Sequence, residues 1–311
     1  MNNIRIIDLP SLDAISQKYD FAFFALGYES RCISAARKFS KKQVQTTKIV
    51  VLAFNDKGLQ FKSNKDEYIS MYGDNCFLSP DPSDDIFLYN FLQNNTSGLK
   101  EISILIDYSS MSRIWYTAII NWSKLKAESL KVTIDFVYTL GDYKISEEPM
   151  VIQDIQPIPG CEGKAFRQTQ SVAIFGLGFH GYTALCVLDQ IEPDIVYSLL
   201  AYPAGDKAYE KKSFNDNKDL LDKSEKVFKL PLHSIEATYR YLSEIVASHL
   251  HCHEVTLIPM GPKPHTLASI LVALSFPEVT CLRVSHTNDA IDVMPRDEFI
   301  ITRLSFENPE R

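Results

Sequence analysis

The chain has 311 residues, 45% of them hydrophobic and 23% charged, which is the composition of an ordinary globular protein with one large core or two domains. Its 32 basic and 39 acidic residues leave a net charge of -7, which disfavours a broad nucleic-acid-binding surface. No apolar run reaches the roughly 18 residues of a membrane span, and no signal peptide is recognisable. Six scattered cysteines without a CxxC pair indicate a cytoplasmic protein with reduced thiols.

Short apolar runs alternate with longer amphipathic stretches in the first half of the chain. Helices are expected before Phe39 and over about 111–126, and strands over residues 4–7, 20–25, 48–54, 102–106 and 132–138. Continuously apolar strands separated by helices predict a sheet of mainly parallel strands with both faces covered.

The same order of parts returns in the second half. Helices are expected through Leu188 and up to about Leu274, and strands over residues 171–175, 194–200, 255–258 and 279–284. Each half has a strand that ends at a glycine-aromatic pair, Gly27-Tyr28 in the first half and Gly178-Phe179 in the second. We therefore expect an α/β protein of two Rossmann-like halves that arose by internal duplication. The alternative is two unrelated α/β domains that share this order.

A segment rich in proline and glycine separates the two halves. It predicts an N-terminal half over residues 1–145, a linker over 146–170 and a C-terminal half over 171–311. Residues 150–152 could form an edge strand within that linker.

Ligands of open α/β sheets bind at the carboxyl ends of the strands, where helix N-termini attract anions. In the first such loop Gly27 permits a sharp turn, Arg31 could bind a phosphate, and Glu29 could bind a ribose hydroxyl or act as a base. The alternative is a helix-terminal carboxylate beside a solvated arginine. The second loop combines an acid, serines and an arginine beyond the needs of a helix cap: Asp107, Ser109, Ser110 and Arg113.

Two further loops belong to the second half. The first contains Gly178 and His180 in a GxGxxG pattern that could cradle an anion, with His180 as a donor to phosphate. No acidic residue closes the following strand at Leu200, which weakens a classical NAD site. The other loop brings charge to a helix start through Lys263 and His265, with Thr266 as a possible cap.

Two of these regions resemble known proteins. The loop before Lys263 resembles the glycine-lysine loop of CARF domains, which sense cyclic oligonucleotides in CRISPR-linked defence, although Pro262 replaces the threonine of that loop. The first half resembles uncharacterised bacterial proteins of antiphage defence loci. Their Gly-aromatic-Glu-x-Arg loop matches residues 27–31, and their Asp-x-Ser-Ser-x-x-Arg loop matches residues 107–113.

These observations lead to three functional hypotheses. The first is a sensor or regulatory component of a bacterial antiphage defence system that binds a nucleotide or another phosphate-bearing small molecule, with a partner protein of a defence complex. The second is an enzyme acting on a nucleotide or NAD-like substrate, with Glu29 or Asp107 as the acidic catalyst. The third is a scaffold. No cofactor and no membrane are expected. No metal is expected either, because the cluster of histidines and a cysteine at residues 249–254 is interpreted as structural.

Overall fold

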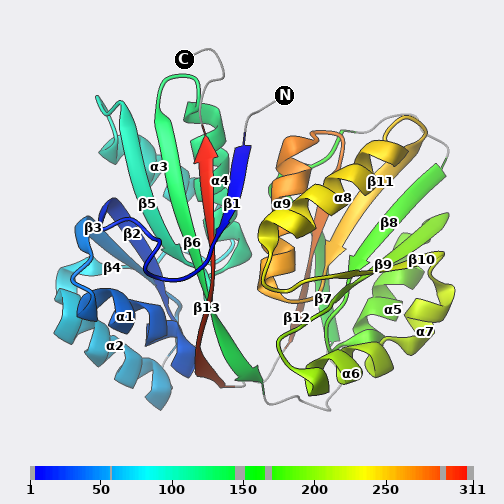
Figure 1. Ribbon diagram of the computed structural model, residues 1–311, viewed down its shortest axis with the longest axis horizontal. Coiled ribbons are helices and arrows are strands. Elements are labelled where there is room, and N and C mark those ends of the chain that lie inside the picture. The colour runs from blue at the N-terminus through cyan, green and yellow to red at the C-terminus, as the bar shows by residue number, and fades with distance from the viewer. Residues whose placement is uncertain (1–3, 57, 144–150, 165–169, 288–291, 307–311) are drawn as a thin grey trace. The chain divides into compact units, whose positions relative to one another are not determined.

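The computed structural model describes residues 4–56, 58–143, 151–164, 170–287 and 292–306 (Figure 1). The chain divides into two compact units. Unit 1 holds Met1–Lys144 and Ala290–Arg311, and unit 2 holds Ile145–Asp289. In the described parts of the chain, no helix is long and apolar enough to cross a membrane.

The described strands of unit 1 form one seven-stranded sheet in the order β1-β13-β6-β5-β2-β3-β4. The strands from β6 to β4 in this order are parallel. Strand β13 pairs antiparallel with β6, and β1 pairs antiparallel with β13. Their bounds are β1 Ile4–Leu9, β2 Lys18–Leu26, β3 Gln45–Ala53, β4 Phe77–Leu78, β5 Glu101–Asp107, β6 Lys131–Tyr143 and β13 Val293–Phe306.

The helices of unit 1 cover both faces of this sheet, as the continuously apolar strands predict (Figure 1). Helix α1 (Ser34–Lys41) contacts α2 (Leu59–Tyr72), and α3 (Ile86–Asn95) contacts α4 (Arg113–Lys126). Helix α4 is buried along most of its length, and its Trp115 and Trp122 are fully buried. The described part of the unit also contains the 3₁₀ turns η1 (Ser30–Ile33) and η2 (Asp74–Cys76).

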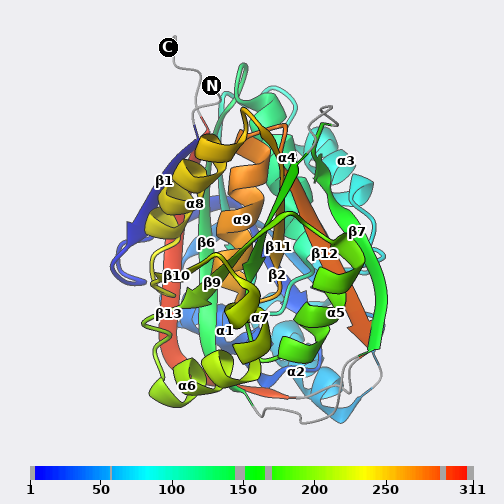
Figure 2. The same ribbon diagram turned by 90° about the vertical axis from the view of Figure 1, so that its right-hand side faces the viewer.

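Unit 2 contains a sheet of six described strands in the order β10-β9-β8-β11-β12-β7. Helices α8 and α9 contact each other, as do α5 and α7, and Figure 2 shows the two pairs on opposite faces of this sheet. The bounds are β7 Val151–Glu162, β8 Gln170–Gly176, α5 Gly181–Ile191, β9 Ile195–Ala201, α6 Lys207–Asp216, α7 Lys218–Lys223, β10 Lys226–Leu230, α8 Ile235–His249, β11 His253–Pro259, α9 Lys263–Ser275 and β12 Thr280–Thr287.

The predicted fold class is confirmed, and the two sheets share one strand order. Strands β2, β3, β4, β5 and β6 occupy the same places as β8, β9, β10, β11 and β12. Asp107 and Pro259 are each the last residue of equivalent seven-residue strands. This is the arrangement that an internal duplication would produce.

A shared contact also relates the two glycine-aromatic loops. In unit 1 the buried Asn64 donates from Nδ2 to the carbonyl oxygen of Gly27, over 3.0 Å. In unit 2 the buried Asn217 donates from Nδ2 to the carbonyl oxygen of Gly178, over 2.7 Å. Asn64 follows β3 and Asn217 follows the equivalent strand β9, so Gly27 and Gly178 hold corresponding positions.

The predicted division of the chain is wrong in two places. Part of the expected linker 146–170 is β7, an edge strand of unit 2 that pairs antiparallel with β12. The end of the expected C-terminal half 171–311 is β13, which pairs antiparallel with β6 in unit 1. The strand that follows each half is therefore added to the sheet of the other half. Pro157 is tolerated in β7 because an edge strand needs fewer backbone donors.

Candidate ligand-binding site

The candidate site of unit 1 lies where its strand order reverses. The chain runs outward from β2 to β3 and β4, then returns to the opposite side of β2 to form β5 and β6. The loops that follow β2 and β5 are therefore neighbours at the carboxyl edge of the sheet, the usual ligand position in a doubly wound fold. The hydroxyl of Ser110 donates to Glu29 Oε2 over 2.5 Å, which joins the two predicted loops directly.

Arg31 is buried, unlike the solvated or phosphate-facing arginine that its position suggests. Its Nε donates to Glu29 Oε2 over 2.8 Å, with side-chain exposures of 3% for Arg31 and 17% for Glu29. Its Nη1 donates to the hydroxyl of Tyr138 over 3.1 Å, and its guanidinium lies over the Tyr138 ring. A phosphate would have to compete with Glu29 for this guanidinium.

Asp107 and Ser109 hold the second loop in place. The buried Asp107 accepts at Oδ1 from the backbone N–H of Ser109 over 3.0 Å and from its hydroxyl over 2.5 Å. The Ser109 oxygen in turn accepts from the backbone N–H of Thr139 over 2.7 Å. This chain of contacts ties the end of β5 to β6 and fixes the approach of the chain to α4.

The N-terminus of α4 presents an arginine without a side-chain partner among the residues that the structure describes. Arg113 is the first residue of this 14-residue helix and is half-buried. Within the described residues its side chain makes no hydrogen bond and no ion pair. The N-cap residue Ser112 does not cap the helix, because its hydroxyl donates to the carbonyl of Pro82 over 2.8 Å. Positive charge and unpaired N–H groups therefore coincide at this helix end.

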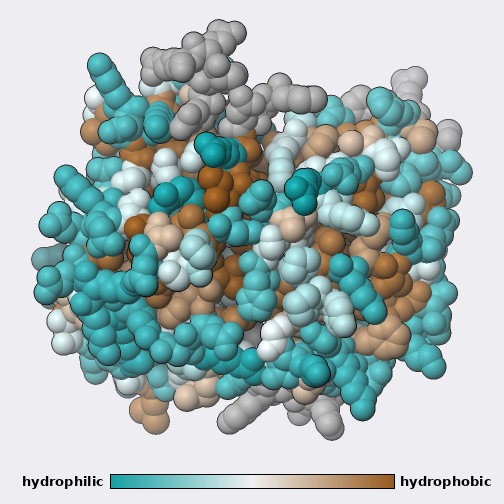
Figure 3. All heavy atoms as spheres, viewed as in Figure 1, coloured by the Kyte–Doolittle hydropathy of each residue, from teal (hydrophilic) through white to brown (hydrophobic). Residues whose placement is uncertain are grey.

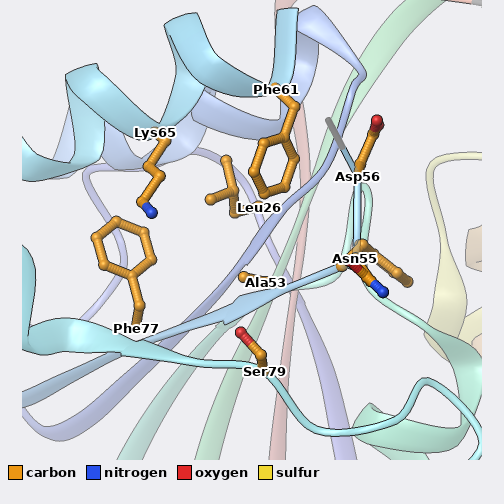
Figure 4. Close-up of a pocket in the computed structure, with 9 residues that line it drawn as sticks. Leu26, Ala53, Asn55, Asp56, Phe61, Lys65, Phe77 and Ser79 are labelled. Carbon is orange, nitrogen blue, oxygen red and sulfur yellow. The ribbon is translucent and has the colours of Figure 1, made fainter. Parts of the chain in front are cut away.

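The loops after β2 and β5, with the N-terminus of α4, are called the crevice below. A cavity of about 400 Å³ lies beside it, at the carboxyl ends of β2, β3 and β4 (Figure 4). Phe54 belongs to its wall and packs against Trp115 of α4, with ring centroids 4.7 Å apart. The lining comes from four separate parts of the chain: Leu26, Ala53, Phe54, Asn55, Asp56, Phe61, Lys65, Phe77 and Ser79.

Sequence reasoning missed this cavity. The only available signal was the polar pair Asn55-Asp56 directly after a predicted strand. Nothing in the pattern marked Phe61, Lys65 or Phe77 as neighbours of that strand end. The missed partners of Arg31 and Ser30 had no local signal either: Tyr138 lies on β6, and Asp292 accepts from the backbone and hydroxyl of Ser30 over 2.6 and 2.7 Å.

The equivalent crevice of unit 2 is packed with backbone. A Cβ at Gly178 would lie 3.0 Å from the carbonyl oxygen of Met260, and one at Gly261 only 2.7 Å from that of Leu177. The two loops after β8 and β11 thus touch where a ligand would otherwise enter. His180 is the N-cap residue of α5, where burial lowers its pKa. Lys263 is the first residue of α9 and is half-buried.

His265 and Thr266, which the sequence predicts as ligand-binding residues, do not present their side chains at the surface of unit 2. Both side chains are buried on α9. His265 Nε2 contacts the carbonyl oxygen of Pro231 over 3.2 Å, and burial lowers the pKa of His265 to about 4. The imidazole is therefore neutral at pH 7 and brings no charge to the helix start. Thr266 is not the cap either, because Pro262 is the N-cap and the Thr266 hydroxyl faces the Pro262 carbonyl oxygen.

The histidine-rich segment brings three side chains close together at the end of α8. His249 Nδ1 lies 3.4 Å from His253 Nδ1, and Cys252 Sγ lies 3.0 Å from the same His253 nitrogen. Over the part of the chain that the structure describes, no group of three or more histidine, cysteine or acidic residues could hold a metal ion.

No protein-family model matches the chain, and no curated protein sequence matches it. The class of protein is therefore defined by the fold itself, a pair of doubly wound α/β units with the same strand order. The likeness to defence-associated proteins and to CARF domains stays a prediction from short motifs.

Proposed function

We propose that unit 1 binds a nucleotide-type ligand at the carboxyl edge of its sheet, with the phosphate end at the N-terminus of α4. The observation that carries this proposal is Arg113, a half-buried arginine at a helix N-terminus without a protein partner among the described residues. A helix N-terminus and an arginine both favour an anion, and a phosphate would satisfy the two together.

A purely structural role explains Arg113 less well. A cation beside the positive end of a helix dipole is unfavourable unless an anion compensates it. The carboxylates of Glu29 and Asp107 do not supply that compensation in this structure. Glu29 contacts Arg31 and Ser110, and Asp107 contacts Ser109.

The test is calorimetric titration with ATP, GTP, NAD and cyclic oligonucleotides, beside a thermal melt. A charge-assisted hydrogen bond contributes about 1.5–3 kcal/mol, so Arg113→Ala should weaken binding roughly tenfold to a hundredfold with little change in melting. Arg240→Ala is the matched control, because Arg240 is exposed on α8 of the other unit. If no compound of this panel binds, or if Arg113→Ala binds as tightly as the parent chain, the proposal is refuted.

Recognition accounts for these contacts better than catalysis does. Glu29 is held between an arginine and a serine, and Asp107 accepts two hydrogen bonds from Ser109 and does not line the cavity beside the crevice. A catalytic carboxylate needs access to the reacting atoms. A product formed from any bound nucleotide, detected by chromatography, would favour the enzyme instead.

The scaffold hypothesis requires a contiguous apolar surface. Hydrophilic side chains are interspersed with apolar ones over the face in Figure 3, and the most exposed large apolar residues come from separate elements, such as Leu59 of α2, Leu125 of α4 and Tyr182 of α5. We propose the sensor role in a bacterial antiphage defence system on the loop resemblance. Loss of phage protection in cells that carry Arg113→Ala is the expected result.

A further inference from the structure

We propose that the cavity at the ends of β2, β3 and β4 is a binding site for a nucleobase. This inference rests on the proposed function for the position of the phosphate end, and it adds the class of group that the other end of the ligand must carry. The cavity has a volume of about 400 Å³, within the range of small-molecule pockets.

The apolar part of the cavity suits a flat ring. Leu26 and Ala53 are the last residues of β2 and β3, and they lie between the rings of Phe61 and Phe77 (Figure 4). Phe61 is nearly buried on α2, and Phe77 is half-buried on β4. Aromatic side chains at a nucleotide site bind bases by stacking, because every base has a π-face.

The polar groups of the cavity lie on opposite sides. Lys65 is on one side, where its Nζ lies 5.6 Å from the ring centroid of Phe77. Asn55 and Asp56 are on the other side. Asp56 Oδ1 accepts from the backbone N–H of Gly58 over 2.9 Å, and within the described residues its Oδ2 makes no hydrogen bond.

This separation selects the chemistry of the ligand. A donor on one side and acceptors on the other complement a ring whose edge carries both a carbonyl or ring nitrogen and an N–H group. Nucleobases have such edges, whereas a hydrocarbon chain would leave these polar groups without partners. In the part of the chain that the structure describes, the side chains of Asn55, Lys65 and Ser79 make no hydrogen bond, so a ligand would not have to displace one.

The cavity and the crevice share a wall, which allows one ligand to reach both. Phe54 lines the cavity and packs against Trp115, two residues after Arg113. The position of a Cβ on Gly27 would lie 3.5 Å from the same Phe54 ring. Burial raises the pKa of Tyr28, and the nearby carboxylates of Glu29 and Asp56 raise it further, so Tyr28 lies close to both regions.

The experiment separates the two ends of the ligand. The probes are four nucleosides, the four matching nucleoside triphosphates and inorganic pyrophosphate, each titrated calorimetrically into the full chain. Stacking contributes about 1–3 kcal/mol per base, so Phe61→Leu should weaken a nucleoside and its triphosphate by about tenfold and leave pyrophosphate unchanged. Lys65→Ala should act in the same direction, and Lys62→Ala, at an exposed neighbour on α2, should not. Thermal melts establish that each variant is folded.

The possible outcomes distinguish the two proposals. Nucleosides that fail to bind, or triphosphate affinity that is insensitive to both Phe61→Leu and Lys65→Ala, overturn the nucleobase site. In that case a loss of pyrophosphate and triphosphate binding in Arg113→Ala still supports the proposed function. Conversely, nucleoside binding that depends on Phe61, together with no effect of Arg113→Ala, supports the nucleobase site and refutes the phosphate site. Tight binding of a fatty acid with no nucleoside binding would also refute the nucleobase site.

Discussion

An ion pair between Arg303 and the buried Asp135 joins β13 to β6 of unit 1, and the variant Asp135→Ala removes it. Asp135 lies on β6 with its side chain fully buried. It accepts from Arg303 Nε and Nη2 of β13, each over 2.7 Å, and from the hydroxyl of Tyr19 on β2 over 2.5 Å. Because β13 arrives from the far end of the chain, this carboxylate joins segments more than a hundred residues apart.

The size of the effect follows from the unequal burial of the two partners. Removing one partner of a buried pair costs about 3–5 kcal/mol of unfolding free energy. Asp135→Ala should lie near the lower limit, because the Arg303 side chain is 26% exposed and can regain water. Arg303→Met should lie near the upper limit, because it leaves a fully buried carboxylate without its cation. Asp135→Asn keeps an acceptor and should cost less than either.

Urea unfolding followed by tryptophan fluorescence measures the change in unfolding free energy of unit 1. The two tryptophans of the chain, Trp115 and Trp122, are both buried in α4 of unit 1. Asp142→Ala is the matched control, because the Asp142–Arg296 ion pair joins the same two strands with the Asp142 side chain 58% exposed. Its loss should cost less than about 1 kcal/mol. Equal costs for Asp135→Ala and Asp142→Ala would refute the reasoning.

Three further predictions concern other parts of the fold. Asn64→Ala removes the side-chain donor to the Gly27 carbonyl and should lower the urea midpoint by the equivalent of about 1–3 kcal/mol, whereas an unchanged midpoint would show that the loop is held otherwise. The pKa of His265 is about 4 in the folded chain against 6.5 in the unfolded chain, so the unfolded chain binds the proton first and stability should fall as the pH drops from about 6.5 to 4. The loss approaches roughly 3 kcal/mol, and pH-dependent melts of His265→Gln should lack it. Cys252 is exposed and Cys186 is half-buried, while the other four cysteines are buried. A thiol reagent should therefore modify Cys252 faster than the other cysteines, and Cys252→Ser should abolish the fast phase of the reaction.

Much of the architecture follows from local patterns. The apolar runs at residues 20–25, 102–106 and 171–175 all lie inside observed strands, because a strand buried on both faces needs an unbroken apolar segment. Once the fold class is known, the loops after β2 and β5 must be neighbours, since parallel strands end at one edge. The closeness of the loops that carry Glu29 and Ser110 therefore follows from the fold class that the sequence predicts.

The candidate site depended on distant contacts that no local pattern contains. Arg31 is buried because Tyr138 of β6 lies beside it, and the cavity exists because α2 and β4 bring Phe61 and Phe77 to the ends of β2 and β3. His265 is neutral because burial lowers its pKa, and its Nε2 contacts the carbonyl oxygen of Pro231, 34 residues away along the chain.

The exchange of the antiparallel strands β7 and β13 between the two sheets is the clearest case of a feature that only tertiary structure decides. Strand β7 pairs antiparallel with β12, and β13 pairs antiparallel with β6 and with β1. The choice is made by register and by side chains such as Arg303 that meet a buried charge on one neighbour only. Length, composition and periodicity determine which segments become strands and helices, because these are local preferences. The assignment of strands to sheets is a property of the packed chain, because its energy comes from pairs of residues that meet only after folding.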